Sequence, residues 1–221
     1  MSLTNEMNSA LPTVISVIPV VNTEEAIRAN AFTCLFNHIK LYTGKEICDT
    51  EAVLLKKLLK YRVLRKRQYL LQEGDVCRYL YYVVDGALRM YSVNSRGQES
   101  ILALGVENNW IGDRESMAHG IPSNYNIDAI EHTILLQFPV EYIELFIKTM
   151  PAFATLIRLQ TKEFSIDTQK RIYAVLNLTA EERYRELLAT RPEFGQRFSQ
   201  NLIAAYLGVK PETLSRVRKR Y

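Results

Sequence analysis

The alternation of apolar and polar positions divides the chain into a helical beginning, a β-rich middle and a helical end. Residues 24–42 open with Glu24 and Glu25 and stop before Gly44, which predicts a helix. A second helix is expected over residues 50–59. From 61 to 138, short apolar runs follow one another at a spacing of roughly 8–12 residues. This middle section predicts an antiparallel β-roll of the jelly-roll type.

Turn residues separate these short runs. They stand at Glu73-Gly-Asp75, at Asp85-Gly86 and at Asn94-Ser-Arg-Gly97. We interpret Asp85-Gly86 and Arg96-Gly97 as hairpin turns, because glycine adopts the positive φ that tight hairpins need. Helical character returns after Pro139, with a short helix expected up to Ile147.

A long helix is predicted over residues 151–177. Its apolar stripe suits pairing with a second copy of the chain, or burial against the same chain. The stripe consists of Phe153, Leu156, Ile157, Phe164, Ile172, Tyr173 and Leu176. Thr179-Ala-Glu-Glu182 is a capping box that starts a further helix, which is expected to end near Arg191-Pro192.

Residues 198–221 have the spacing of a helix-turn-helix. Ser199 can cap a first helix, whose apolar side is formed by Leu202, Ile203, Tyr206 and Leu207. Gly208 tolerates the left-handed backbone of a sharp turn, and Pro211 suits the first turn of a second helix. In that second helix Leu214 and Val217 point to the core, while the outward side chains are Glu212, Ser215, Arg216 and Lys219.

The charge of the chain is concentrated at this end. Residues 209–221 hold five basic side chains and one acidic side chain, a balance of +4 that equals the formal net charge of the whole chain. A neutral body with a positively charged end is typical of proteins that bind nucleic-acid phosphates. A solvated basic tail is the alternative. The apolar spacing from Ala204 to Val209 favours the helix-turn-helix.

Other chemistry is sparse. The three cysteines (Cys34, Cys48 and Cys77) are widely separated, and neither they nor the three histidines show metal-ligand spacing. We therefore expect reduced thiols, a cytoplasmic protein, no metal and no iron–sulfur cluster. No catalytic motif is found, so we do not expect an enzyme. The apolar stretch at residues 11–21 contains two prolines and is too short to span a bilayer, and no basic residue precedes it. It predicts an extended arm, either disordered or packed on a neighbour.

Four motifs resemble the Crp/Fnr family (cyclic-AMP receptor protein/fumarate–nitrate regulator) over residues 23–221. They are Glu73-Gly-Asp75, Val83-Val-Asp-Gly86, Ile111-Gly-Asp113 and Pro211-Glu-Thr-Leu-Ser-Arg216. The resemblance implies an α+β fold with a β-roll sensor domain, a long dimerisation helix and a C-terminal winged helix-turn-helix. The expected division is an N-terminal arm (1–22), a cyclic-nucleotide-binding-like sensor domain (23–150), a dimerisation helix (151–177) and a DNA-binding domain (178–221).

By the same resemblance, Glu212, Ser215 and Arg216 match the base-reading positions of the family. Their chemistry agrees, because arginine can bridge guanine O6 and N7, and glutamate can accept from cytosine N4. Pro211 departs from members that carry a further arginine there. The full set of expected DNA-binding residues is Ser199, Gln200, Lys210, Glu212, Thr213, Ser215, Arg216 and Lys219.

The sensor pocket departs from the nucleotide-binding pattern. Gly112 and Asp113 match the pair that holds a ribose, but Ser123 and Asn124 stand where the family has an Arg-Ser pair for the cyclic phosphate. Without that guanidinium the strongest anion contact is missing, so cyclic AMP is not the expected effector. Thr168 loosely matches a hydroxyl that contacts the adenine. Arg114 is interpreted as a surface arginine, with a replacement phosphate partner as the alternative.

The leading hypothesis is a transcription regulator controlled by a small-molecule effector other than cyclic AMP. Its expected partners are double-stranded DNA, a second copy of the chain and RNA polymerase, with no membrane. The alternative is a small-molecule or cyclic-nucleotide sensor that acts through protein contacts without reading DNA. The basic side chains within residues 56–67 are interpreted as a solvated face, with a second nucleic-acid surface as the alternative.

Overall fold

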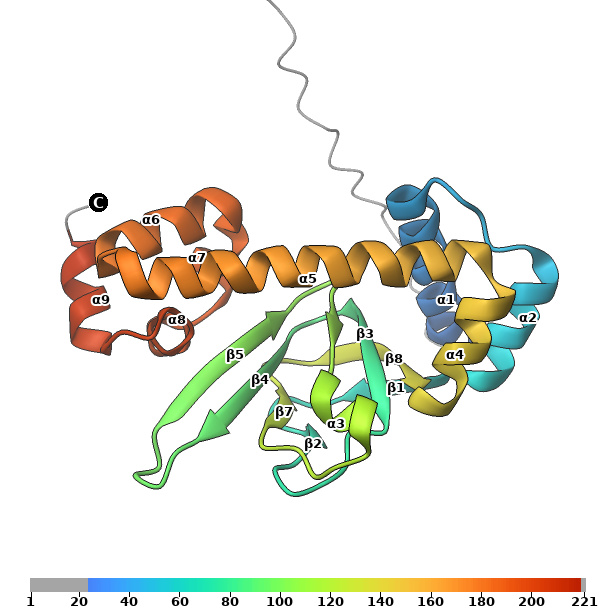
Figure 1. The fold of residues 1–221 in the computed structure, drawn as a ribbon, viewed down its shortest axis with the longest axis horizontal. Helices are drawn as coiled ribbons and strands as arrows, with labels where there is room; N and C mark the ends of the chain where they lie inside the picture. Colours follow the sequence, from blue (N-terminus) through green and yellow to red (C-terminus); the bar gives the residue numbers. More distant parts are fainter. Residues whose placement is uncertain (1–23, 220–221) are drawn as a thin grey trace, which may run out of the picture.

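Residues 24–219 are described by the computed structural model (Figure 1), so the expectations for the arm at residues 1–22 lie outside the described part. Two helices come first, α1 (Glu24–Thr43) and α2 (Asp49–Leu58), and both match the predicted ranges to within one residue at each end. At the start of α2 the Glu51 carboxylate accepts the Cys48 backbone N–H at 2.8 Å. This contact satisfies a helix-end donor that would otherwise lack a partner.

The β-rich middle forms two four-stranded antiparallel sheets, with strand orders β1-β8-β3-β6 and β2-β7-β4-β5. Apolar side chains from both sheets, including Tyr81, Met90 and Leu135, fill the space between them. The predicted β-roll is therefore confirmed. Its strands are β1 (Lys60–Leu64), β2 (Tyr69–Leu71), β3 (Tyr79–Asp85), β4 (Leu88–Val93), β5 (Glu99–Gly105), β6 (Trp110–Ile111), β7 (Asn126–Ala129) and β8 (Thr133–Pro139). The short helix α3 (Arg114–His119) joins β6 to β7.

Only one of the two predicted hairpins is correct. Strands β4 and β5 pair across the turn that contains Gly97, whose φ is +73°. The prediction for Asp85-Gly86 is wrong, because β3 and β4 belong to different sheets and this turn carries the chain from one sheet to the other. Glycine is still required there. Gly86 has φ of +93°, and a Cβ at this position would collide with the carbonyl oxygen of His132.

Helix α4 (Val140–Thr149) leads into α5 (Pro151–Asn177), which runs along the length of the molecule (Figure 1). The predicted apolar stripe of α5 has two different environments. Phe153 and Leu156 are fully buried against α1, α4 and the roll. Further along, four apolar side chains are 51–75% exposed: Phe164, Ile172, Tyr173 and Leu176. The first half of the helix thus packs within the chain, and the second half presents an apolar face.

Four helices form the C-terminal unit: α6 (Ala180–Thr190), α7 (Pro192–Arg197), α8 (Gln200–Leu207) and α9 (Pro211–Arg218). The predicted capping box is confirmed, since Thr179 accepts the Glu182 N–H at 3.2 Å and Glu182 accepts the Thr179 N–H at 2.8 Å. The expected wing is absent from residues 180–219, which contain no strand. The sequence prediction missed α7, which begins with Pro192 at its first position and buries Phe194. Across residues 24–219, no helix is long and apolar enough to cross a membrane.

Candidate nucleic-acid interface and sensor cavity

The turn between α8 and α9 has the predicted geometry. The Ser199 hydroxyl accepts the Leu202 N–H at 3.3 Å and so caps α8. Gly208 ends that helix with φ of +66°, and the Val209 N–H donates to the Ala204 carbonyl at 2.9 Å. This left-handed cap turns the chain sharply without leaving the last carbonyls unpaired. Pro211 then occupies the first turn of α9.

Helix α9 is anchored on one side and open on the other. Leu214 is fully buried and Val217 is 8% exposed, while Glu212, Arg216 and Lys219 are exposed. The Arg216 Nε donates to the Glu212 carbonyl at 3.4 Å, and Arg216 forms no ion pair within the described residues. Its two terminal amino groups are therefore available to an external acceptor.

The structure brings the eight predicted DNA-binding residues onto one helix pair. Ser199 and Gln200 stand at the start of α8, and Lys210 immediately precedes α9. Six of the eight side chains are exposed, whereas Thr213 and Ser215 are half-buried. A role in binding DNA stays a prediction for each of them.

The helix-turn-helix packs directly on the β-roll, which the sequence did not indicate. We use the name junction core for one buried cluster that combines residues of the roll with residues of helices α6 to α9. Its roll members are Ala87, Tyr91, Ile101, Leu104 and Val106, and its helical members are Tyr184, Leu187, Phe194, Phe198, Ile203, Ala204, Leu207, Leu214 and Val217. The orientation of α9 is therefore coupled to the roll by apolar packing.

Arginine side chains reinforce the junction core. Arg197 of α7 binds both oxygens of Glu107, at 2.6 and 2.7 Å, and also contacts Glu131. Arg171 of α5 donates to the carbonyls of Leu102 and Ile101 in β5, and to that of Tyr206 in α8. One guanidinium thus ties the long helix, the roll and the helix-turn-helix together.

Two of the predicted effector residues contact each other. The Ser123 hydroxyl donates to Asp113 Oδ2 at 2.6 Å, and Asp113 Oδ1 accepts the N–H groups of Glu115 and Ser116 at 3.1 and 3.2 Å. Asp113 and Ser123 are only 4% and 2% exposed. Both side chains therefore hold α3 in place, and their polar atoms already have partners. Gly112 adjoins them, while Asn124 is exposed.

The remaining predicted effector residue lies elsewhere. Thr168 lines a cavity of about 300 Å³ between α5 and the roll, together with Arg114, Trp110 and Phe164. Its hydroxyl donates to the Phe164 carbonyl at 2.7 Å. The Arg114 guanidinium lies 4.0 Å from the centre of the Phe164 ring. Partial burial lowers the pKa of Arg114, and no carboxylate pairs with it among the described residues. Arg114 is exposed, as expected of a surface arginine, and it also lines this cavity, so the alternative role as a phosphate partner stays a prediction.

Metal and thiol chemistry has little support here. No group of three or more histidine, cysteine or acidic side chains within residues 24–219 is placed to hold a metal ion. All three cysteines are unpaired thiols. Burial and the nearby Asp85 carboxylate raise the pKa of Cys34, and burial raises that of Cys77, so both favour the unreactive thiol form.

Comparison with known proteins agrees with this architecture. The cyclic nucleotide-binding domain family matches residues 61–150, the section that forms the β-roll. The transcriptional activator protein Anr of Pseudomonas aeruginosa is 27% identical over 172 residues, which cover 72% of this chain and 69% of that protein. The fumarate and nitrate reduction regulatory protein of Vibrio cholerae is 28% identical over 170 residues, covering 72% and 67% of the two chains. Both relatives are named as regulators, and Anr as a transcriptional activator.

A solved structure extends the likeness to the whole fold. A protein from Eubacterium rectale that is assigned to the crp/fnr family superposes with a TM-score of 0.63 at 18% identity. The match covers 83% of this chain and 87% of that one. Together these similarities support a regulator of the Crp/Fnr family.

Proposed function

We propose that the chain is a sequence-specific transcription regulator of the Crp/Fnr type that binds DNA through α9. The observation that carries this proposal is the two-sided character of α9. Leu214 and Val217 fix it on the junction core, while Glu212 and Arg216 are exposed and form no ion pair within the described residues. A helix exposed in this way can enter the major groove, where arginine and glutamate distinguish guanine and cytosine edges.

A homodimer is part of the proposal. The apolar side chains that α5 presents at Ile172, Tyr173 and Leu176 are 56–75% exposed in the described chain, and the Phe164 ring is 51% exposed beside Arg114. Pairing of two such faces would bury this surface and place two α9 helices on one side of the assembly. Two half-sites about 34 Å apart, one turn of DNA, would then be read together.

The names of the relatives suggest the biological setting. Anr is called a transcriptional activator, and the Vibrio cholerae protein a regulatory protein. We extend this to the present chain as a cytoplasmic regulator that works on RNA polymerase at promoters. The domain limits proposed are 23–150 for the sensor, 151–177 for the dimerisation helix and 178–221 for DNA binding.

The proposed sensor takes an effector other than cyclic AMP. Asp113 and Ser123 are engaged with each other and with α3, and Ser123 stands where nucleotide-binding members carry the arginine for the cyclic phosphate. Of the predicted effector residues, Thr168 faces the cavity between α5 and the roll, next to Arg114. We place the effector in this cavity.

Selection of genomic fragments by the purified full-length protein, followed by sequencing, tests the proposed function. The expected result is enrichment of a two-fold symmetric motif whose half-sites are one helical turn apart. Enrichment of no motif, with binding that depends only on salt and length, would favour a sensor that acts through protein contacts.

A further inference from the structure

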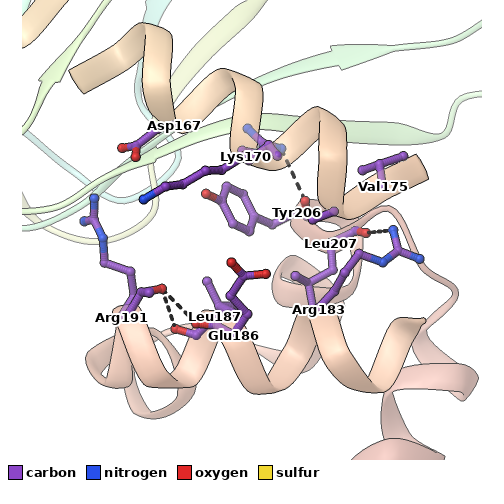
Figure 2. Close-up of a pocket in the computed structure, with 12 residues that line it drawn as sticks. Asp167, Lys170, Val175, Arg183, Glu186, Leu187, Arg191, Tyr206 and Leu207 are labelled. Atoms are coloured by element: carbon purple, nitrogen blue, oxygen red, sulfur yellow. Dashed lines mark hydrogen bonds between the residues drawn. The ribbon is translucent and has the colours of Figure 1, made fainter. Parts of the chain in front are cut away.

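A second cavity, of about 230 Å³, lies where the C-terminal half of α5 meets α6 and α8 (Figure 2). Four of its residues also line the larger cavity beside Arg114 and Thr168: Asp167, Arg171, Arg191 and Tyr206. The two cavities are therefore neighbours along α5. The smaller one is bounded by both the long helix and the helix-turn-helix unit, so its contents would contact both.

The lining of this second cavity carries an excess of positive charge. Its basic residues are Lys170, Arg171, Arg183 and Arg191, and its carboxylates are Asp167 and Glu186. Four cations against two anions leave a surplus of two positive charges. None of these six side chains belongs to an ion pair within the described residues. No carboxylate therefore neutralises any of these four positive charges at ion-pair distance within the described residues.

Two of the four cations are held in place by backbone carbonyls. Arg183 donates to the Leu207 carbonyl at 2.7 Å, and its Nε is buried without a hydrogen-bond partner. Arg171 donates to the Tyr206 carbonyl at 3.3 Å, and its guanidinium lies 4.4 Å from the centre of the Tyr206 ring. These contacts fix the geometry of the site before any ligand enters.

The other two cations are available to a ligand. Neither the Lys170 nor the Arg191 side chain forms a hydrogen bond or an ion pair in the described chain, and the Arg191 guanidinium lies 5.6 Å from the centre of the Phe194 ring. Figure 2 shows the Lys170 and Arg191 side chains reaching towards the same side of the cavity, from α5 and from the end of α6. An anion between them would be bound by both elements at once.

We propose that this cavity binds a small dianionic metabolite, a phosphomonoester or a dicarboxylate. Two surplus positive charges match two negative charges, and guanidinium groups bind both phosphate and carboxylate. The volume is below the range usual for drug-sized ligands, which suits a molecule of a few carbon atoms. Val175, Leu187 and Leu207 provide an apolar wall for its carbon skeleton.

Binding there would act on the position of the helix-turn-helix. Lys170 belongs to α5, whereas Arg191 follows α6, and the only covalent link between the two helices is residues 177–180. A dianion that bridges Lys170 and Arg191 would stabilise one orientation of the C-terminal unit on the long helix. The effect on DNA affinity rests on the proposed function, but the binding itself does not.

Isothermal titration calorimetry on the full-length protein tests the site directly. Glycerol 3-phosphate, succinate and inorganic phosphate are the probes, each at constant ionic strength, with chloride as the monovalent reference. The expected result is saturable binding of one molecule per protomer for at least one dianion and none for chloride. Preference for glycerol 3-phosphate or succinate identifies the phosphomonoester or the dicarboxylate as the ligand class. Absence of saturable binding by all three probes overturns the proposal.

Variants that should weaken binding and one that should strengthen it distinguish a specific site from general damage to the fold. Lys170→Ala and Arg191→Ala should each weaken binding by about ten-fold or more, because each removes a charged contact. Glu186→Gln should strengthen it, because it removes a competing carboxylate. Lys162→Ala, also on α5 but outside the cavity, is the matched control and should change nothing. Binding that is equal in all four variants would overturn the assignment. Because heat of binding is measured without DNA, failure to bind DNA would contradict the proposed function and leave the site standing.

Discussion

Arg197 and Glu107 are 90 residues apart in sequence, yet they form a bidentate ion pair with N–O distances of 2.6 and 2.7 Å. Arg197 belongs to α7, and Glu107 follows β5 in the roll, where its Oε1 also accepts the Gly86 N–H at 2.8 Å. The pair therefore joins the C-terminal unit to the β-roll at the edge of the junction core. Both side chains are partly exposed, at 24% and 35%.

Arg197→Ala should loosen this junction. We expect a loss of about 1–2 kcal/mol in the free energy of unfolding, between the values for exposed and buried pairs, because two partly buried carboxylates lose their partner. Lys148→Ala, which removes an exposed pair with Glu144, should cost less than about 0.5 kcal/mol. Urea denaturation and the rate of proteolysis between α5 and α6 measure the effect. Equal effects of the two variants would show that the Arg197 contacts do not hold the junction.

The same ion pair should make stability depend on pH. Burial alone would raise the pKa of Glu107, but hydrogen bonds from Arg197 and from backbone N–H groups outweigh burial and lower it below 4.5. A carboxyl with a lowered pKa stabilises the fold above its ordinary pKa, and this contribution is lost as the pH falls through the folded-state value. The free energy of unfolding should therefore decrease as the pH falls from about 5 to about 3. The decrease should be less steep for the Glu107→Gln variant. If the stability of the wild-type protein and that of Glu107→Gln changed with pH in parallel, the Glu107 ion pair would not be the cause of the pH dependence.

The exposed face of α5 should govern assembly. Ile172→Glu places a charge in the proposed dimer interface, so sedimentation at micromolar concentration should show a shift from dimer to monomer. Affinity for a two-half-site DNA should fall at the same time. Leu41→Glu, at a residue of α1 that is 86% exposed, is the matched control and should remain a dimer. A wild-type monomer, with or without DNA, would contradict the proposed assembly.

Cyclic AMP should bind weakly or not at all. The hydroxyl of Ser123 is used by Asp113, and a serine replaces the arginine that would hold the phosphate. Calorimetry with the wild-type protein should therefore give no saturable heat. Sub-micromolar affinity would contradict this expectation. It would indicate that the phosphate binds Arg114, which lines the cavity between α5 and the roll.

Local features of the fold could be predicted from the sequence because neighbouring residues determine them. Thr179 and Glu182 cap α6 through contacts three residues apart, and Gly208 and Pro211 set the turn before α9. The helix-turn-helix could be predicted for the same reason, because its cap, turn and apolar positions lie close together in the sequence.

Features that depend on distant segments could not be predicted in this way. The turn at Gly86 has hairpin residues, but the pairing of β3 with β8 and of β4 with β7 places its two strands in different sheets. The contacts of Arg197 and Arg171 with the roll join segments 66 to 90 residues apart, and no local pattern marks them. Helix α7 was missed because Pro192 resembled a helix end, whereas it begins the next helix.

Base reading by α9 is the central claim, and one comparison tests it most directly. Fluorescence anisotropy would measure the affinity of Arg216→Ala and Lys219→Ala for the cognate site and for a random duplex, over a range of salt concentrations. Arg216→Ala should weaken cognate binding by about 1–3 kcal/mol and relax the preference at one G·C pair. Lys219→Ala, as a phosphate contact, should weaken both duplexes alike and reduce the salt slope by about one unit per protomer. If Arg216→Ala lowered the affinity for both duplexes by the same factor, Arg216 would be a phosphate contact and the claim of base reading would be wrong.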